Sequence, residues 1–306
     1  MCPAARGAAV EVILNARSGT GHGAAVRQRL ADAFASRGVD ARISMAGDGE
    51  TLIALARHAV HSEADSVVAG GGDGTISSVA AAMIDSGKTL GVLPFGTLNH
   101  FAKDMAIPLD LDSAVDTIAE GHATAVDVGD VNGRIFLNNS SLGLYPRMVR
   151  ERERQQRLGW GKVPASIWAA IGVLRRHPFL EVRLGVEGKE LAGRTPFVFV
   201  GNNVYAVERL DIGTRACLDK GELSLYATSR TGRLGLILLA LRALVGGLRQ
   251  ERDFLALTAH DIWVGTKRKG VQVALDGEVT IMEPPLHFRI RPAALRVLAP
   301  ARDRTP

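Results

Sequence analysis

The chain has 306 residues, of which 46% are hydrophobic and 23% are charged, a composition typical of a folded globular protein long enough for two domains. Its two cysteines, Cys2 and Cys217, are too few for a disulfide framework, so we expect free thiols in a reducing compartment. The net charge of +5 favours anionic partners such as nucleotides or phospholipid surfaces, but the sequence has no recognised motif or aromatic stacking platform for nucleic acid.

From Val10 to about Ala125, the chain alternates short β-branched runs with segments of helical length. This alternation predicts an open parallel α/β sheet, in which the loops at the carboxyl ends of the strands lie along one edge. The expected strands are residues 10–14, 39–44, 66–69 and 89–93, and the expected helices are residues 24–36, 50–61, 76–85 and 112–120.

After Asp127 the pattern changes to short alternating runs with turn signals such as Asn132-Gly133, which predicts a largely antiparallel β-rich domain. The predicted domains are residues 1–125 and 126–291, and a final strand near residues 295–298 would return residues 292–306 to the first domain. Helical insertions are expected at about residues 147–176 and 233–249.

Both insertions combine arginines with apolar residues, which suits either an anionic membrane surface or a solvated helix beside a core helix. The apolar window 234–248 is interrupted by Arg242 and is shorter than the roughly 20 residues that span a bilayer. The amino terminus lacks the apolar run of a signal peptide. We therefore expect a cytoplasmic protein, peripherally associated with membranes.

The strongest motif is Gly70-Gly71-Gly72-Asp73-Gly74-Thr75, between the predicted strand 66–69 and the helix that begins near Ile76. Glycines let the backbone approach a ligand closely, and free amides at a helix start attract anions, so the junction suits a phosphate group. Asp73 would repel a bare phosphate and therefore indicates a bridging cation. A tight turn with an aspartate cap explains one or two of these glycines well, but not all of them.

Two further loops are expected at the same edge of the sheet. Thr97 and Asn99 follow the predicted strand 89–93 and suit either nucleotide contacts or helix capping. The segment Asn15–Gly23 follows the first predicted strand and adds hydroxyl groups and glycines. Three such loops on one edge favour a binding site over a coincidence.

Late in the chain, Asp276-Gly277 separates the alternating runs 271–275 and 279–281. This dipeptide is a strong signal for a type I′ hairpin turn. By itself the pattern predicts a turn and requires no catalytic role for Asp276 or Glu278.

Taken together, Gly71–Thr75, Gly96-Thr97-Leu98-Asn99 and Leu275-Asp276-Gly277-Glu278 resemble, in this order, the motifs of the diacylglycerol kinase catalytic superfamily, which includes bacterial lipid kinases, sphingosine kinases and ceramide kinases. The resemblance runs from Asn15 to about Ile290. It implies an α/β fold whose amino-terminal nucleotide domain is similar to those of NAD kinases and phosphofructokinases. It also implies a carboxyl-terminal β-rich domain, with the active site between the two.

The resemblance implies an ATP-dependent, Mg²⁺-assisted kinase that phosphorylates a lipid hydroxyl, with diacylglycerol and sphingoid bases as the leading acceptors. Asp276, slightly ahead of Glu278, is implied as the general base, and Asp73 and Asp219 as metal ligands. The nucleotide contacts it implies are Asn15, Ala16, Arg17, Ser18, Gly19, Ser44, Gly71, Gly72, Asp73, Gly74, Thr75, Thr97 and Asn99.

The sequence departs from the family pattern at two places. His100 stands where the family often has aspartate, and Lys220 stands where a metal-binding aspartate is common. The ammonium group of Lys220 could replace a structural cation, or Asp219 and Glu222 could bind one.

Two other functions remain open from the sequence. A kinase for a soluble acceptor, such as NAD or a sugar phosphate, would share the Gly-Gly-Asp-Gly motif. A non-catalytic module that senses nucleotides or membranes would explain His100 and Lys220. The expected partners are a lipid substrate at a membrane surface and a second copy of the chain in a homodimer, without nucleic acid.

Overall fold

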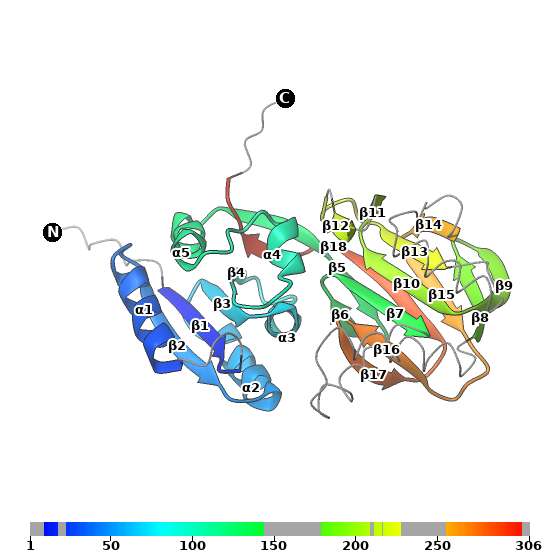
Figure 1. The fold of residues 1–306 in the computed structure, drawn as a ribbon, viewed down its shortest axis with the longest axis horizontal. Coiled ribbons are helices and arrows are strands. Elements are labelled where there is room, and N and C mark those ends of the chain that lie inside the picture. The colour runs from blue at the N-terminus through cyan, green and yellow to red at the C-terminus, as the bar shows by residue number, and fades with distance from the viewer. Residues whose placement is uncertain are drawn as a thin grey trace. The chain divides into compact units, whose positions relative to one another are not determined.

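The computed structural model describes residues 9–17, 23–143, 179–208, 211–215, 217–227 and 255–301 (Figure 1). The chain divides into two compact units. The α/β unit comprises Met1–Asp127 and Pro292–Pro306, and the β unit comprises Val128–Arg291. Two strands, β5 (Ala123–Val131) and β18 (Leu286–Leu298), contribute residues to both units.

The α/β unit is built on a parallel sheet with the strand order β2-β1-β3-β4-β18. Its other strands are β1 (Ala9–Asn15), β2 (Asp40–Ala46), β3 (Ser66–Gly71) and β4 (Thr89–Pro94). Consecutive apolar residues in β3 and β4 are buried, as expected for strands that are covered on both faces.

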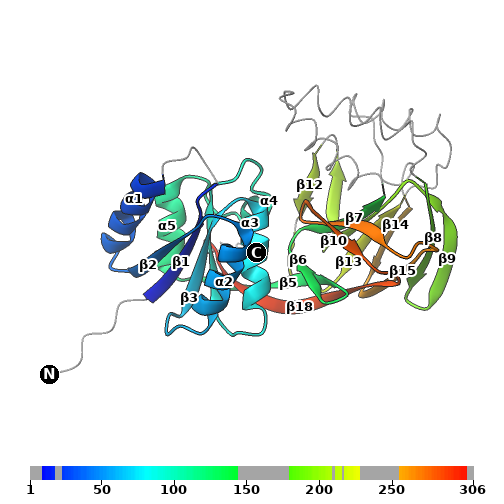
Figure 2. The ribbon, with the colours of Figure 1, turned by 90° about the horizontal axis from the view of Figure 1, so that it is seen from below.

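The helices of this unit pack in two pairs. Helix α1 (Gly23–Ala35) contacts α5 (Leu111–Glu120), and α2 (Gly49–Val60) contacts α3 (Asp73–Met83). Figure 2 shows the two pairs on opposite sides of the strands. Leu30 and Phe34 of α1 share a buried core cluster with Val115 and Ile118 of α5, so the apolar stripes of the two helices meet over the sheet.

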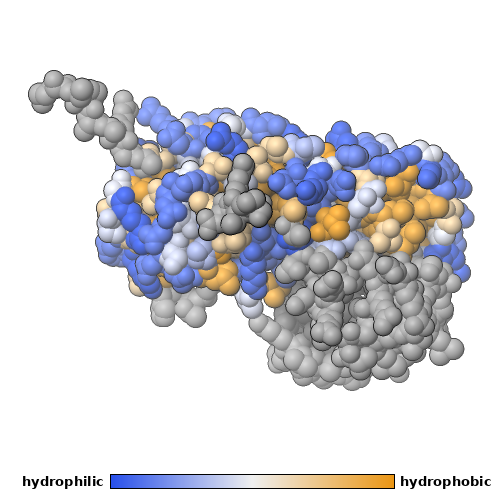
Figure 3. Space-filling model, turned by 90° about the horizontal axis from the view of Figure 1, so that it is seen from above, coloured by the Kyte–Doolittle hydropathy of each residue, from blue (hydrophilic) through white to orange (hydrophobic). Residues whose placement is uncertain are grey.

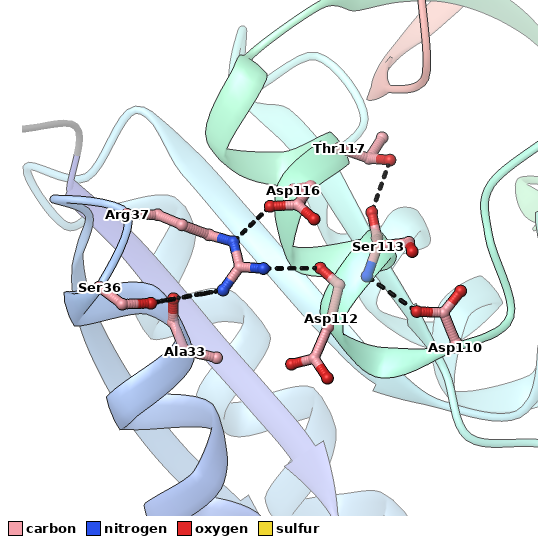
Figure 4. A network of polar contacts seen from close by, with 8 residues as sticks. All are labelled: Ala33, Ser36, Arg37, Asp110, Asp112, Ser113, Asp116 and Thr117. Carbon is pink, nitrogen blue, oxygen red and sulfur yellow. Dashed lines mark hydrogen bonds and ion pairs between the residues drawn. The ribbon is translucent and has the colours of Figure 1, made fainter.

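A polar network fixes the end of α1 to α5 (Figure 4). The guanidinium group of Arg37 donates to the carboxylate of Asp116, to the carbonyl oxygen of Asp112 at 3.2 Å and to the carbonyl oxygen of Ala33 at 2.9 Å. The Asp110 carboxylate caps the start of α5 by accepting from Ser113 N at 2.9 Å.

The β unit contains a six-stranded antiparallel sheet with the order β14-β13-β10-β7-β16-β17. These strands are β7 (Asn139–Gly143), β10 (Phe197–Asn202), β13 (Leu223–Ala227), β14 (Leu255–Ala259), β16 (Val271–Leu275) and β17 (Glu278–Met282). Most residues of β7, β10 and β13 are buried, and Leu142, Val200 and Val273 belong to the same core cluster as Phe288 of β18.

The remaining strands of the β unit complete this core. Strands β8 (Leu180–Val186), β9 (Lys189–Thr195) and β15 (Asp261–Gly265) pair in the order β15-β8-β9 beside β18. Strand β6 (Arg134–Phe136) pairs with β5, while β11 (Tyr205–Glu208) and β12 (Asp211–Arg215) form a separate ribbon. On the face drawn in Figure 3, hydrophobic patches interrupt a largely hydrophilic surface.

Two-residue turns with positive φ at both positions close three of the hairpins, as in type I′ turns. They are Asn132-Gly133 (φ 49° and 82°), Glu187-Gly188 (46° and 79°) and Asp276-Gly277 (46° and 90°). The hairpins expected at Asn132 and Asp276 are therefore present in the structure.

The predicted fold class, a parallel α/β domain followed by an antiparallel β-rich domain, is confirmed. The sequence did not predict the short helix α4 (His100–Asp104). The expected helical insertions at residues 147–176 and 233–249 lie outside the described residues. No helix among the described residues is both long and apolar enough to cross a membrane.

Candidate functional site

In the α/β unit, the candidate site lies at the carboxyl ends of β1 and β3. In the sheet, β1 lies between β2 and β3. The chain runs from β1 to β2 on one side and from β3 to β4 on the other, so the loops after β1 and β3 lead in opposite directions. Open parallel sheets bind ligands at such a switch point, in the crevice beyond the carboxyl ends of the strands.

A hydrogen bond joins the two diverging loops. Asn15 Nδ2, at the end of β1, donates to Thr75 Oγ1 of α3 at 3.0 Å. Asn15 Oδ1 accepts from Arg17 N at 3.0 Å, which shapes the start of the first loop. The structure therefore brings together Asn15, Arg17 and Thr75, which the sequence assigned to one site.

The glycine loop between β3 and α3 leaves helix amides available to a ligand. Gly72 is the N-cap of α3, and no side chain caps the helix there. A Cβ atom on Gly71 would come within 2.5 Å of the Thr75 side chain. The loop thus requires glycine at this position and presents uncapped amides, an arrangement that suits phosphate. Asp73 is the first residue of the helix rather than its cap.

The loop after β4 packs closely against the glycine loop. A Cβ atom on Gly96 would lie 2.6 Å from Gly72 Cα, so a side chain at Gly96 would push the loops apart, whereas a Cβ atom on Gly72 would lie 3.4 Å from Gly96 Cα. Phe95 N donates to Gly71 O at 3.0 Å. Asp73 Oδ1 accepts from Phe101 N at 3.1 Å, and this bond fixes the orientation of the Asp73 carboxylate.

Asn99 is 6% exposed and adopts a left-handed conformation with φ 51°. Its Oδ1 accepts from Gly96 N at 2.9 Å, and its Nδ2 donates to Gly96 O at 3.0 Å. Asn99 occupies the N-cap position of α4, as the capping alternative expected, but its side chain makes no capping bond. The side chain instead holds the loop in shape, while Thr97 is exposed at the tip.

The other predicted nucleotide contacts occupy different places. Ala16 N donates to Ala46 O at 2.9 Å, which ties the first loop to the end of β2. Ser44 lies within β2, opposite Ile13 in the parallel register. Ser18 and Gly19 lie outside the described residues.

The uncapped amides at the start of α3 and the oriented carboxylate of Asp73 suit a nucleoside triphosphate with its magnesium ion. Mg²⁺ is commonly held by one or two carboxylates together with phosphate oxygens, and Asp73 is an oriented carboxylate beside the phosphate-suited amides. In the described part of the chain, no group of three or more His, Cys, Asp or Glu side chains is placed to hold a metal without such help.

In the β unit, the candidate site is the turn between β16 and β17. The Asp276 carboxylate accepts three backbone bonds from consecutive residues, which are Leu137 N at 2.8 Å, Asn138 N at 2.8 Å and Asn139 N at 3.0 Å. Asp276 N in turn donates to Asn139 O at 2.9 Å. Both carboxylate oxygens of Asp276 are therefore used to hold the turn against the segment 137–139.

Glu278 has surroundings that suit a general base better than those of Asp276. The residue as a whole is exposed, but protein atoms around its carboxylate desolvate it and raise its pKa, and the negative charge of Asp276 raises the pKa further. A raised pKa makes a carboxylate a stronger proton acceptor once it is ionised. We therefore place Glu278 ahead of Asp276 as the proposed base, whereas the sequence placed Asp276 slightly ahead.

A buried polar network, not predicted from the sequence, supports the segment 137–139. Arg215 is 5% exposed and donates to Leu137 O at 2.7 Å and to Asn138 Oδ1 at 2.7 Å. Asn202 Nδ2 also donates to Leu137 O, at 2.8 Å. Two asparagine pairs, Asn138-Asn139 and Asn202-Asn203, stand among apolar residues, and this pattern could have indicated a buried polar network.

The segment that contains Asp219 and Lys220 is attached to this network through its backbone. Lys220 N donates to Asn203 Oδ1 at 3.0 Å, and Asn203 N donates to Glu222 O at 2.9 Å. The side chains of Asp219 and Lys220 are exposed. A hydrogen-bonded asparagine thus holds this segment where the family resemblance implied a cation.

Two family models match the chain. The diacylglycerol kinase catalytic domain matches residues 9–131, and the YegS C-terminal NAD kinase beta sandwich-like domain matches residues 148–299.

Relatives and solved structures agree with these matches. The diacylglycerol kinase of Bacillus subtilis (strain 168) is 30% identical over 244 residues, covering 75% of this chain and 76% of the relative. A diacylglycerol kinase of Staphylococcus aureus (strain Newman) is 29% identical over 180 residues, covering 58% of this chain and 56% of the relative. The crystal structure of a diacylglycerol kinase from Bacillus anthracis str. Sterne has a TM-score of 0.70 at 19% identity, covering 95% of this chain and 97% of that one. At 19% identity, this likeness shows that the two chains share a fold.

Proposed function

Because the chain belongs to the diacylglycerol kinase family, we propose that it transfers the γ-phosphoryl group of ATP to the hydroxyl group of a lipid. The observation that carries this proposal is the close approach of Gly72 and Gly96 beside the uncapped start of α3. This arrangement offers backbone amides to a phosphate beside a loop in which Gly96 cannot carry a side chain without displacing Gly72.

Each loop of the α/β unit has a role in the proposed reaction. The amides at the start of α3 bind phosphate oxygens, and the bond from Asn15 to Thr75 holds the first loop against that helix. Asp73, whose carboxylate is oriented by Phe101 N, is the residue that would hold a magnesium ion. When bound, Mg²⁺ neutralises charge that develops on the transferred group.

Glu278 is the proposed general base. The lipid oxygen forms a bond to the γ-phosphorus while the bond from that phosphorus to the β–γ bridging oxygen breaks, and ADP leaves with the electron pair. The hydroxyl proton passes to the Glu278 carboxylate. Asp276 holds the turn that carries this base, and its charge adds to the desolvation that raises the pKa of Glu278.

Diacylglycerol is the first acceptor to test, because two relatives carry the name diacylglycerol kinase, and a sphingoid base is the second. The experiment supplies ATP labelled in the γ-phosphate, Mg²⁺ and vesicles that contain diacylglycerol, sphingosine, ceramide and monoacylglycerol. A labelled lipid would support the proposal and identify the acceptor. Labelled product from NAD or a sugar phosphate, with none from lipid, would contradict the lipid assignment. ATP binding without any transfer would favour a sensing module.

A membrane surface is the proposed location of the acceptor, and one exposed loop of the β unit supports this. Lys267, Arg268 and Lys269 are consecutive and exposed, and only Lys267 has an ion pair in the described part of the chain, at 3.2 Å from Glu181. Ile281, which is 70% exposed, lies beside Gly270 at the end of this loop. Cations beside an exposed apolar side chain suit anionic headgroups.

This membrane contact is testable by charge reversal. We expect Arg268→Glu/Lys269→Glu to weaken sedimentation with vesicles of anionic phospholipid. Arg57→Glu/Lys189→Glu makes the same change in net charge at exposed positions elsewhere and is expected to bind like the wild type. Equal loss in both double variants would show that net charge alone matters and would contradict a specific contact through this loop.

A further inference from the structure

We propose that Arg215 is a positioning residue for the reaction, holding the segment 137–139 so that its amides fix the turn that carries Asp276 and Glu278. This inference rests on the proposed function, because it assigns the base to that turn. Arg215 is 77 residues from Asn138 in sequence and belongs to none of the motifs that indicated the site.

The first step is the attachment of Arg215 to the segment. Its Nη1 donates to Leu137 O at 2.7 Å and its Nη2 donates to Asn138 Oδ1 at 2.7 Å. Nη1 also donates to Asn202 O at 3.1 Å, and the guanidinium lies 5.3 Å from the centre of the Tyr205 ring. The planar guanidinium thus binds backbone and side-chain oxygens on two sides, and a lysine ammonium cannot reproduce this fork.

The second step runs from the segment to the turn. The amides of Leu137, Asn138 and Asn139 all point to the Asp276 carboxylate, at 2.8 to 3.0 Å. Arg215 binds the carbonyl oxygen of Leu137 and the side chain of Asn138, so it contacts two of the three residues that present these amides. Loss of Arg215 would therefore let the three amide donors move away from the Asp276 carboxylate.

The third step runs from Asp276 to Glu278. Only Gly277 separates them in a turn with positive φ at Asp276 and Gly277, so displacement of one carboxylate displaces the other. Desolvation by the surrounding protein atoms is the main cause of the raised pKa of Glu278, and the charge of Asp276 adds to it. If the turn moves, Glu278 leaves these surroundings, so its pKa falls toward its ordinary value and the base is no longer held in place.

The test compares Arg215→Met with Arg194→Met. Arg194 also has an aromatic neighbour, with its guanidinium 5.8 Å from the centre of the Phe179 ring, but it is exposed and lies outside this network. We expect Arg215→Met to lower kcat on the order of 10- to 100-fold, as for a displaced catalytic group, and to leave the KM for ATP unchanged. We also expect the acidic limb of its pH–rate profile to move to lower pH. Arg194→Met should match the wild type in all three measurements.

Asn138→Ala provides a second variant if Arg215→Met does not fold, because it removes one Arg215 acceptor and keeps the cation. A wild-type kcat and pH profile in a folded Arg215→Met or Asn138→Ala protein would overturn the proposal.

A carboxyl NMR titration of Glu278 separates this proposal from the proposed function. It is measured on the full chain without substrate. If wild-type protein transfers no phosphate to any acceptor, the proposed function fails, whereas a fall in the pKa of Glu278 in Arg215→Met still supports the positioning role. An unchanged Glu278 pKa in that variant would overturn it.

Discussion

Asn15 and Thr75, which are 60 residues apart in sequence, are joined by a hydrogen bond of 3.0 Å from the asparagine Nδ2 to the threonine Oγ1. The bond links the loops that leave β1 and β3 at the switch point of the parallel sheet. One side-chain pair thus connects the first loop to the start of α3, where the phosphates of a nucleotide are proposed to bind.

We predict that Thr75→Val, which keeps the shape of this buried residue, weakens ATP binding by about 1 kcal/mol, the usual net value of one hydrogen bond. Asn15→Ala should have a similar effect. Because both changes remove the same bond, the double variant should lose less than the sum of the two single losses. Calorimetric titration with ATP of the wild type, the two single variants and the double variant measures this double-mutant cycle. Strictly additive losses would show that the bond does not act in nucleotide binding.

The approach of Gly96 to Gly72 gives a second prediction. A methyl group at Gly96 would lie 2.6 Å from Gly72 Cα and 2.6 Å from Asn99 Oδ1, so Gly96→Ala should destabilise the protein by about 1–3 kcal/mol and abolish ATP binding. Gly49→Ala is the matched control, because a methyl group at the start of α2 meets no atom within 4 Å. Urea unfolding and ATP titration measure the two effects. Retained ATP binding in Gly96→Ala would contradict phosphate binding between these two loops.

Glu278 should govern the acidic limb of the pH–rate profile. A base must be ionised to act, so activity should fall as pH decreases through the pKa of Glu278, which is raised above the ordinary 4.5. We expect Glu278→Gln to lower kcat by about 100-fold or more and to remove this limb. Asp276→Asn should move the limb to lower pH, because it removes the neighbouring charge. An identical limb in Glu278→Gln would exclude Glu278 as the base.

Arg37 should stabilise the fold at neutral pH and lose this contribution in acid. The hydrogen bond from Arg37 is the main cause that lowers the pKa of Asp116 below 3.8, so this carboxylate stabilises the fold above that pH. The contribution is lost as pH falls through the lowered pKa. Arg37→Met should therefore be less stable than wild type at pH 7, and the difference should shrink as pH falls below 3.8 through the lowered pKa. Urea unfolding at pH 7 and at a series of acidic pH values tests this, and a constant difference would argue against linkage to Asp116.

The Asp219 segment should not need a metal for its stability. Asn203, which is fully buried with φ 65°, accepts the Lys220 amide, so Asn203→Gly should cost about 1–3 kcal/mol while keeping the backbone accessible. Asp219→Asn at its exposed position should change stability by less than about 0.5 kcal/mol. A chelator should leave the unfolding temperature of nucleotide-free protein unchanged. A clear fall on chelation, absent in Asp219→Asn, would instead identify a bound cation.

Much of the fold was predictable because its signals are local. The expected strand at residues 10–14 lies within β1, and the Asp276-Gly277 dipeptide forms the expected turn. Glycine loops after buried strands likewise placed the phosphate-suited segment beside α3.

Long-range side-chain geometry was not predictable in this way. Residue type alone does not indicate that Asn99 bonds to its own loop instead of capping α4. Residue type also does not indicate that the Asp276 carboxylate accepts hydrogen bonds from the amides of residues 137–139. The pairing of β7 with β16 brings these partners together. The order of the two carboxylates as candidate bases therefore depended on the structure.

The last strand has a consequence for the order of synthesis. Strand β4 pairs with β18 through Thr89↔Arg296 and Leu90↔Val297, so the final partner of the first sheet is translated only after the β unit. While the ribosome is still translating the β unit, the β4 edge has no β18 to cover it, and uncovered edges invite pairing with other chains. Release of a chain that stops short of Pro292 should therefore yield a protein that aggregates through its amino-terminal half.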